Sequence, residues 1–209
     1  MRGLPAAPPW AFRGRSWRDA PFAALDFETT GLDYSADAIV SFGVVPVRHG
    51  RAIVRESVHQ LVDPDVPPTP RSQTVHELRP VDLAGSPRLD EARERLAEVL
   101  AGSYVLAWFA EVEVHFLARA FGGSLRAWSR RTIDVRNLAI AVDHQPPSRR
   151  LEHGYALTSV ANRLGVPVAN PHEALDDALV TAQLFLVLVS KIPDVPEPSV
   201  RDLLRIGRP

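Results

Sequence analysis

The chain has 209 residues, which suits one large domain and is short for two. It contains no cysteine, so a disulfide framework, a thiolate zinc site, a cysteine nucleophile and an iron–sulfur cluster are all excluded. The 24 basic and 25 acidic side chains nearly cancel, so any site for nucleic acid must be a local one. No apolar run reaches the roughly 18–20 residues of a membrane span, and the first residues contain no signal-peptide core. A soluble cytoplasmic protein without membrane contact is expected.

The first part of the chain predicts an N-terminal arm followed by three strands. Residues 1–20 combine Pro, Arg and aromatic residues. This composition is typical of a disordered or strapped-down terminus and, alternatively, of a segment that stacks on bases. Apolar runs then predict strands joined in hairpin fashion, over residues 21–28, 38–50 and 51–62. A Pro-rich connection over residues 63–70 ends this part.

Strands alternate with helices in the second part. Apolar residues at helical spacing run from 87 to 101, and Gly102 stops that helix. The next segments predict a strand, a helix, a short strand leading into a helix, a loop, a helix closed by Gly165, a long apolar helix and a tail: 104–109, 111–121, 131–142, 144–150, 156–165, 172–192 and 193–209. This order predicts an α/β protein in which a single domain, residues 21–192, holds a mixed five-stranded sheet flanked by helices.

Two carboxylates end the first predicted strand. Asp26 and Glu28 are two residues apart, so strand geometry directs both side chains to the same face. Two carboxylates on one face repel each other unless a cation lies between them, and an oxygen-preferring divalent ion is the natural partner. The alternative is a solvent-facing acidic strand end without a ligand.

A second acidic group opens the long C-terminal helix. His172 and Asp177 are five residues apart, about 140° beyond a full helical turn, so they do not share one helical face. His172 is therefore expected in the loop or at the helix N-cap, with Asp177 pointing inward. The pair can supply a base and a metal carboxylate. Alternatively, the acids at this helix start only complement the helix dipole.

Taken together, the motifs DFETTGL and HEALDDALVTAQLF closely resemble the first and third motifs of the DEDD exonuclease superfamily. More narrowly, they resemble its DEDDh branch, which includes the proofreading epsilon subunit of bacterial DNA polymerase III. The resemblance extends from Phe22 to Val189, and the segment TVHELRPVDLAGSP is similar to the family's short His-containing turn. It implies a ribonuclease H-like fold and removal of nucleotides from 3′ ends with two divalent metal ions, Mg²⁺ or Mn²⁺.

The resemblance also assigns roles to individual residues. Asp26, Glu28 and Asp177 match the family's metal ligands, and His172 matches its general base. The residues that match its contacts to the terminal nucleotide are Thr29, Leu32 and His76. A neutral imidazole can accept the proton of the attacking water, so activity should fall on the acid side as His172 becomes protonated.

The second motif departs from the family's His-Asn-Ala-x-Phe-Asp pattern. The pair Phe116-Leu117 anchors the register, and Glu113 then occupies the position of the metal-binding Asp. Glu is one methylene longer than Asp and still offers an oxygen ligand. Glu111 is the rival acid, but it lies on another face of the predicted helix.

Trp108 and Phe109 stand where the family has His-Asn. For one of the two rings we expect packing in the core, while for the other both packing and stacking on a base remain open. Asp134, after the last short strand, matches a frequent family Asp, and we interpret it as a helix cap.

The function predicted from these motifs is that of a metal-dependent 3′–5′ exonuclease on DNA, most readily on single-stranded 3′ ends. An exoribonuclease of the ribonuclease T or oligoribonuclease type shares the same chemistry, and a 2′-hydroxyl contact would discriminate between the two. A catalytically weak nucleic-acid-binding module and a structural subunit of a DNA polymerase are the alternatives outside enzyme chemistry. A DNA polymerase is accordingly a candidate partner.

Overall fold

The computed structural model describes residues 5–8, 10–143, 154–193, 195 and 197–209, so the loop expected at 144–150 lies outside the described residues. The strands are β1 (Phe22–Thr29), β2 (Ile39–Arg48), β3 (Arg51–Ala52), β4 (Val58–Leu61), β5 (Tyr104–Ala107) and β6 (Thr132–Asp134). The helices are α1 (Pro70–His76), α2 (Pro80–Leu83), α3 (Leu89–Leu100), α4 (Glu111–Phe121), α5 (Leu125–Ser129), α6 (Val135–Val142), α8 (Leu157–Leu164), α9 (Ala174–Val189) and α10 (Val200–Ile206). The described part of the chain also forms three short 3₁₀ helices: η1 (Trp10–Phe12), η2 (Trp17–Asp19) and η3 (Val54–Glu56).

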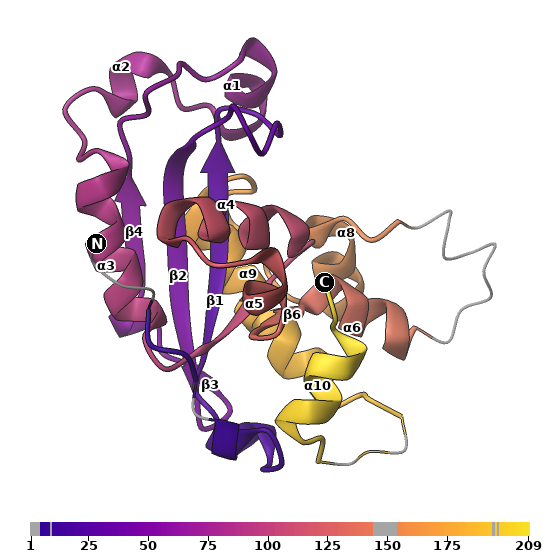
Figure 1. Ribbon diagram of the computed structural model, residues 1–209. Helices are drawn as coiled ribbons and strands as arrows, with labels where there is room; N and C mark the ends of the chain where they lie inside the picture. Colours follow the sequence, from indigo (N-terminus) through magenta and orange to yellow (C-terminus); the bar gives the residue numbers. More distant parts are fainter. Residues whose placement is uncertain (1–4, 9, 144–153, 194, 196) are drawn as a thin grey trace.

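The sheet is mixed, with the strand order β3-β2-β1-β5-β6 (Figure 1). β1 pairs antiparallel with β2, and β5 runs parallel to both β1 and β6. The third strand, expected over 51–62, is interrupted by η3. Its two halves, β3 and β4, each pair antiparallel with β2. The predicted five-stranded, ribonuclease H-like sheet is confirmed, with its third strand divided in two.

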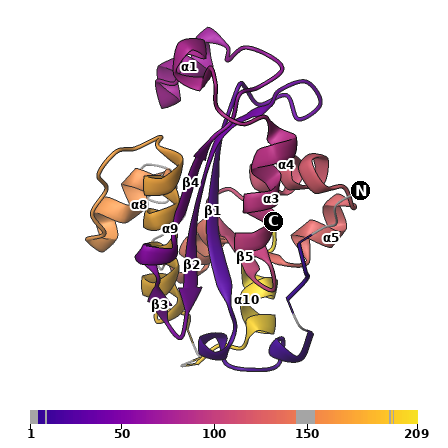
Figure 2. The same ribbon diagram turned by 90° about the vertical axis from the view of Figure 1, so that its left-hand side faces the viewer.

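Helices cover both faces of the sheet, as Figure 2 shows, with α8 and α9 on one side and α3, α4 and α5 on the other. A hydrophobic core lies on each face of the sheet, and because side chains alternate along β1, this strand contributes to both cores. Phe22 and Ala24 pack in the core that α9 covers. Ala23 and Leu25 pack in the core that α3 and α4 cover. Asp26 and Glu28 continue the first series, so the chain directs them toward the α9 face.

The start of α9 lies directly on β2. A Cβ atom at Gly43 would lie 2.2 Å from the carbonyl oxygen of Ala174, so only glycine permits this close approach. Gly43 is the β2 residue paired with Asp26 of β1. The glycine therefore seats the N-terminus of α9 beside the strand that carries the two acids.

The connection after β4 contains structure that the sequence did not predict. Thr69 caps α1 by accepting a hydrogen bond from the backbone N–H of Ser72, and Pro70 occupies the first helical position. Both are recognised helix-start signals, and they lie at the end of the Pro-rich connection. The helix delivers His76, which is buried at its last position.

Both chain ends, as far as they are described, pack on the domain. The Trp17 ring is buried against Phe185 of α9, and Leu203 of α10 is fully buried. Ser16 and Ser199 form an isolated β-bridge between the two ends. The division into an arm (1–20), an exonuclease domain (21–192) and a tail (193–209) stays a prediction. Among the described residues, no helix has the length and apolar character needed to cross a membrane.

Candidate active site

One cavity of about 460 Å³ lies at the carboxyl end of β1. Every candidate site residue predicted from the sequence lines it: Asp26, Glu28, Thr29, Leu32, His76, Glu113, His172 and Asp177. They come from β1 and the loop after it, from α1, from α4, and from α9 with the turn before it. The tertiary fold thus brings together residues that are spread over most of the sequence.

The two strand acids share one face, as their spacing predicts. Glu28 is buried, with 8% of its surface exposed, and Asp26 is half-buried. They are therefore not a solvent-facing strand end. Burial of a carboxylate requires a compensating partner, and both side chains open onto the cavity.

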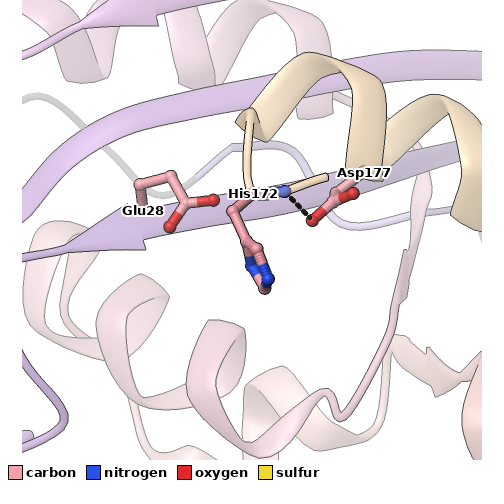
Figure 3. A group of neighbouring side chains, drawn as sticks. All are labelled: Glu28, His172 and Asp177. Carbon is pink, nitrogen blue, oxygen red and sulfur yellow. Dashed lines mark hydrogen bonds between the residues drawn. The ribbon is translucent and has the colours of Figure 1, made fainter. Parts of the chain in front are cut away.

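His172 lies in the turn before α9, as expected, with a left-handed backbone (φ 66°). Its backbone N–H donates a hydrogen bond of 3.1 Å to Oδ2 of Asp177. Figure 3 shows this contact and Glu28 projecting from β1 toward it. One potential ligand atom from each of Glu28, His172 and Asp177 lies within 4.8 Å of the others.

Glu113 enters the cavity from the first turn of α4 and is almost fully buried, whereas Glu111 is exposed. Oε2 of Glu113 and Oδ1 of Asp177 are buried without a hydrogen-bond partner. Buried polar atoms are ordinarily satisfied, so two unpartnered carboxylate oxygens in one cavity fit the coordination of a cation. The donor set, all oxygens with an imidazole at its edge, fits a hard divalent ion.

The carboxylates in this cluster carry like charges and repel one another. Burial, followed by the charges of Asp177 and Glu173, raises the pKa of Glu28 to about 8. Burial is also the main cause that raises the pKa of Glu113 to about 8. The pKa of Asp26 is well above its usual range through burial and then the charges of its carboxylate neighbours. Without a cation the site would hold protons at neutral pH, and a divalent ion would release them.

The other wall of the cavity carries the residues expected to contact nucleotide. Nδ1 of His76 accepts a hydrogen bond from the backbone N–H of Leu78, so its Nε2 carries the proton and donates to the carbonyl of Thr29, at 3.2 Å. Burial lowers the pKa of His76, which favours this neutral form. Leu32 stands beside this wall with 68% of its surface exposed, an apolar surface open to a ligand.

Sequence reasoning missed part of the lining. Arg71, Ser72 and Val75 of α1 also face the cavity, and Arg71 contributes a cationic side chain. The Thr69-Pro70 helix start was the signal that could have placed them. Without that helix, nothing in the Pro-rich connection indicates that these residues meet β1.

The replacements in the second motif occupy distinct environments. Trp108 is half-buried, and its indole N–H donates to the carbonyl of Tyr155, at 3.1 Å. Phe109 is 46% exposed. Asp134 caps α6, as predicted, by accepting from the backbone N–H groups of Arg136 and Asn137. Of the two rings, Trp108 is therefore the one that packs.

Comparisons with known proteins agree on one family. A family model described as an exonuclease, RNase T, matches residues 23–185. The chain is 31% identical over 181 residues to the PolC-type DNA polymerase III of Thermotoga petrophila, covering 86% of this chain and 13% of that protein. It is 22% identical to the 3′–5′ exonuclease DinG of Staphylococcus aureus, covering 90% of this chain and 20% of that protein. The chain thus spans a minor part of both relatives.

A solved structure has the same fold. Exonuclease I of E. coli, in complex with a dT13 oligonucleotide, superposes with a TM-score of 0.69 over 84% of this chain and 42% of that one. The identity over this superposition is 16%, so the likeness bears on the fold alone.

Proposed function

Because the chain belongs to the DEDD family of 3′–5′ exonucleases, whose RNase T model covers most of its length, we propose that it removes nucleotides from the 3′ end of DNA. The family predicted from the sequence motifs is confirmed, and its chemistry is phosphodiester hydrolysis. The observation that carries the proposal is the convergence of Asp26, Glu28, Glu113, Asp177 and His172 on a single cavity. That cavity is large enough to receive a nucleotide.

Four carboxylates hold the metal in this proposal: Asp26, Glu28, Glu113 and Asp177. Two divalent ions, Mg²⁺ or Mn²⁺, would bind there, supplying an activated water and charge stabilisation for the attacking and leaving oxygens. The two unpartnered buried oxygens and the raised pKa values of the carboxyl groups support this assignment. Glu113 fills the place of the family's Asp.

His172 acts as the general base. Its hydrogen bond to Asp177 uses the backbone N–H, so the imidazole ring is available to take a proton. One potential ligand atom each of Glu28 and Asp177 lies within 4.8 Å of a nitrogen of this ring, so the base stands beside the proposed metal site. Proton removal from water by a positioned histidine contributes about 10²–10⁴ to turnover.

Thr29, Leu32 and His76 position the terminal nucleotide. The exposed Leu32 side chain offers an apolar surface to the base, and the His76 ring braces the backbone at the end of β1. Arg71, on the same wall, attracts the phosphodiester. These residues bind and orient the substrate, while the acids and His172 carry the chemistry.

We favour single-stranded DNA over RNA as the substrate. The relatives are named as a DNA polymerase and a 3′–5′ exonuclease, and the similar fold of Exonuclease I was solved with a deoxyoligonucleotide. A side-by-side digestion decides the matter, with 5′-labelled single-stranded DNA, duplex DNA with a mismatched 3′ end, and RNA, each in Mn²⁺. Stepwise shortening of the single-stranded DNA is expected. Preferential digestion of RNA would contradict the DNA assignment, and binding without digestion would indicate a non-catalytic module.

Association with a DNA polymerase is a separate proposal. It rests on the similarity to the PolC-type enzyme, of which this chain matches 13%. Co-purification of a polymerase with the full chain from a cell extract would support it. Recovery of the nuclease alone would contradict it without affecting the proposed chemistry.

A further inference from the structure

A second groove, of about 450 Å³, adjoins the first cavity. It shares four lining residues with that cavity: Asp26, Trp108, His172 and Asp177. Its remaining walls come from Phe109, from Arg136 of α6 and from the segment at Tyr155. Two of the proposed metal carboxylates, Asp26 and Asp177, therefore lie between two spaces, and only the first space has a role in the proposed function.

Phe109 is an unusual residue for its backbone. It has a left-handed conformation, with φ at 60°, which Gly and Asn tolerate and an aromatic residue adopts only under strain. The strain does not bury the ring, since 46% of Phe109 is exposed. Strained conformations persist where the surrounding structure enforces them, and they concentrate at functional sites.

The surrounding structure enforces this one through Asp134. Its carboxylate accepts a hydrogen bond from the backbone N–H of Ala110, at 3.1 Å, and another from that of Arg136, at 2.9 Å. The backbone beside Phe109 is thereby tied to the start of α6. The Arg136 guanidinium lies 5.5 Å from the centre of the Phe109 ring, within cation–π range. The result is a preformed aromatic surface with a positive charge beside it.

We propose that Phe109 and Arg136 form a stacking platform for the nucleotide that precedes the 3′-terminal one. The inference rests on the proposed function: a strand with its terminal nucleotide in the first cavity and its phosphodiester at the carboxylates must continue into an adjoining space. The second groove opens onto two of those carboxylates, Asp26 and Asp177. An exposed ring stacks on any base, and an arginine beside it attracts the phosphate, which suits a single strand held without sequence preference.

The central test compares two single-stranded deoxyoligonucleotides, one intact and one with an abasic residue in the penultimate position. The first cleavage in Mn²⁺ is measured for the wild type, Phe109→Ala and Phe109→Trp. Stacking on an aromatic side chain is worth roughly 5- to 150-fold, so Phe109→Ala should lower kcat/KM on the intact strand by that factor. On the abasic strand the same substitution should change kcat/KM by less than about twofold. Phe109→Trp should retain the preference for the intact strand.

Equal losses on the two strands, or no loss on either, would overturn the platform. Leu125→Ala, which removes an exposed apolar side chain on α5, is the matched control and should behave as the wild type. Arg136→Gln should reduce the salt dependence of binding by about 0.7 in the log–log slope, the contribution of one phosphate on a single strand. An unchanged slope would remove Arg136 from the platform.

A binding measurement separates this inference from the proposed activity. Fluorescence anisotropy of the two labelled strands, with Ca²⁺ as the metal, reports affinity without requiring turnover. Suppose that Phe109→Ala binds the intact strand more weakly than the wild type does but binds the abasic strand equally well, and that the wild type digests neither strand. This result would support the platform and contradict the nuclease. Active digestion with no dependence on Phe109 would contradict the platform and leave the nuclease standing.

Discussion

At the scale of single residues, Asp26 has the most crowded charge environment. Burial and then the charges of Glu113, Glu28 and Asp177 raise its pKa. Asp26→Asn removes one charge from this group, so we expect Mn²⁺-dependent nuclease activity to be abolished. In EDTA at alkaline pH, where the carboxyl groups lose their protons, the melting temperature should rise by roughly 2–4 °C for each kcal/mol of repulsion relieved. Digestion and thermal unfolding of the same preparation check both parts.

Asp90→Asn is the control for this substitution, because Asp90 is an exposed acid on α3 that lines neither the cavity nor the second groove. It should leave digestion unchanged. Undiminished activity in Asp26→Asn would remove this carboxylate from the metal site.

The role of His172 should be distinguishable from that of the carboxylates by how its substitution affects metal binding. His172→Ala is expected to lower turnover by about 10²–10⁴ while Mn²⁺ affinity changes little, because a base contributes to proton transfer and not to ligation. Mn²⁺ titration and single-turnover digestion of the variant measure the two quantities. A collapse of Mn²⁺ affinity with normal turnover per bound metal would make His172 a ligand.

Glu113 and Glu111 form a matched pair within one helical turn. Glu113 is buried in the cavity wall and Glu111 is exposed. Glu113→Gln should therefore cost most of the activity, since it keeps the volume and removes the charge, whereas Glu111→Gln should be nearly silent. Glu113→Asp should also have low activity, because the Asp side chain is shorter by one C–C bond and its carboxylate would not reach the metal. Release of mononucleotides in Mn²⁺ compares the three. If Glu111→Gln is inactive instead, the alignment that places Glu113 at the position of the family's Asp is wrong.

At the scale of elements, the junction between β2 and the start of α9 positions the base. Gly43 admits the carbonyl of Ala174, and nearby a chain of polar contacts holds the helix start. Oγ of Ser41 lies 2.9 Å from Nε2 of His59, and Nδ1 of His59 lies 3.6 Å from Oε1 of Glu173. Glu173 is the N-cap of α9 and directly follows His172 in the chain.

Gly43→Ala tests this junction. The added Cβ would meet backbone atoms of Ala174 that cannot rotate away, so α9 must shift. We expect a loss of stability of about 1–3 kcal/mol, the usual cost of overpacking, together with a loss of turnover. Thermal unfolding and digestion measure the two effects. Gly14→Ala is the control, since a Cβ there meets no atom within 4 Å, and equal behaviour of both variants would contradict the tight junction.

At the scale of the whole molecule, the acid cluster links stability to pH and metal. The folded pKa values of Glu28 and Glu113 are about 8, against an ordinary value of 4.5. Between these limits the folded state binds more protons than the unfolded state, so stability falls as the pH rises. In EDTA the melting temperature should therefore decline from pH 5 to pH 8.5, and the stabilisation by Mn²⁺ should grow over the same interval.

The variant with both Glu28→Gln and Glu113→Gln is the control for the pH dependence. Its decline between pH 5 and pH 8.5 should be smaller, since two of the shifted groups are gone. A wild type whose melting temperature is flat in EDTA would contradict the raised pKa values.

The sequence by itself determined the features that depend on local geometry. A period of two places Asp26 and Glu28 on one face of β1, and Gly102 and Gly165 lie where two helices end. The five-residue spacing places His172 in the turn before α9. These predictions held because backbone geometry over a few residues decides them. The break in the third strand and helix α1 escaped prediction, since their apolar and Pro-rich patterns admit more than one structure.

Only the tertiary structure decided which side chains share the cavity and which rings stay exposed. Trp108 and Phe109 are adjacent aromatic residues that both line the groove, yet the indole of Trp108 is held by the carbonyl of Tyr155, whereas Phe109 is left largely exposed. The unpartnered oxygen of Glu113 and the approach of Ala174 to Gly43 likewise depend on elements far apart in the chain. Such contacts follow from how helices pack on both faces of the sheet, and no local pattern encodes that packing.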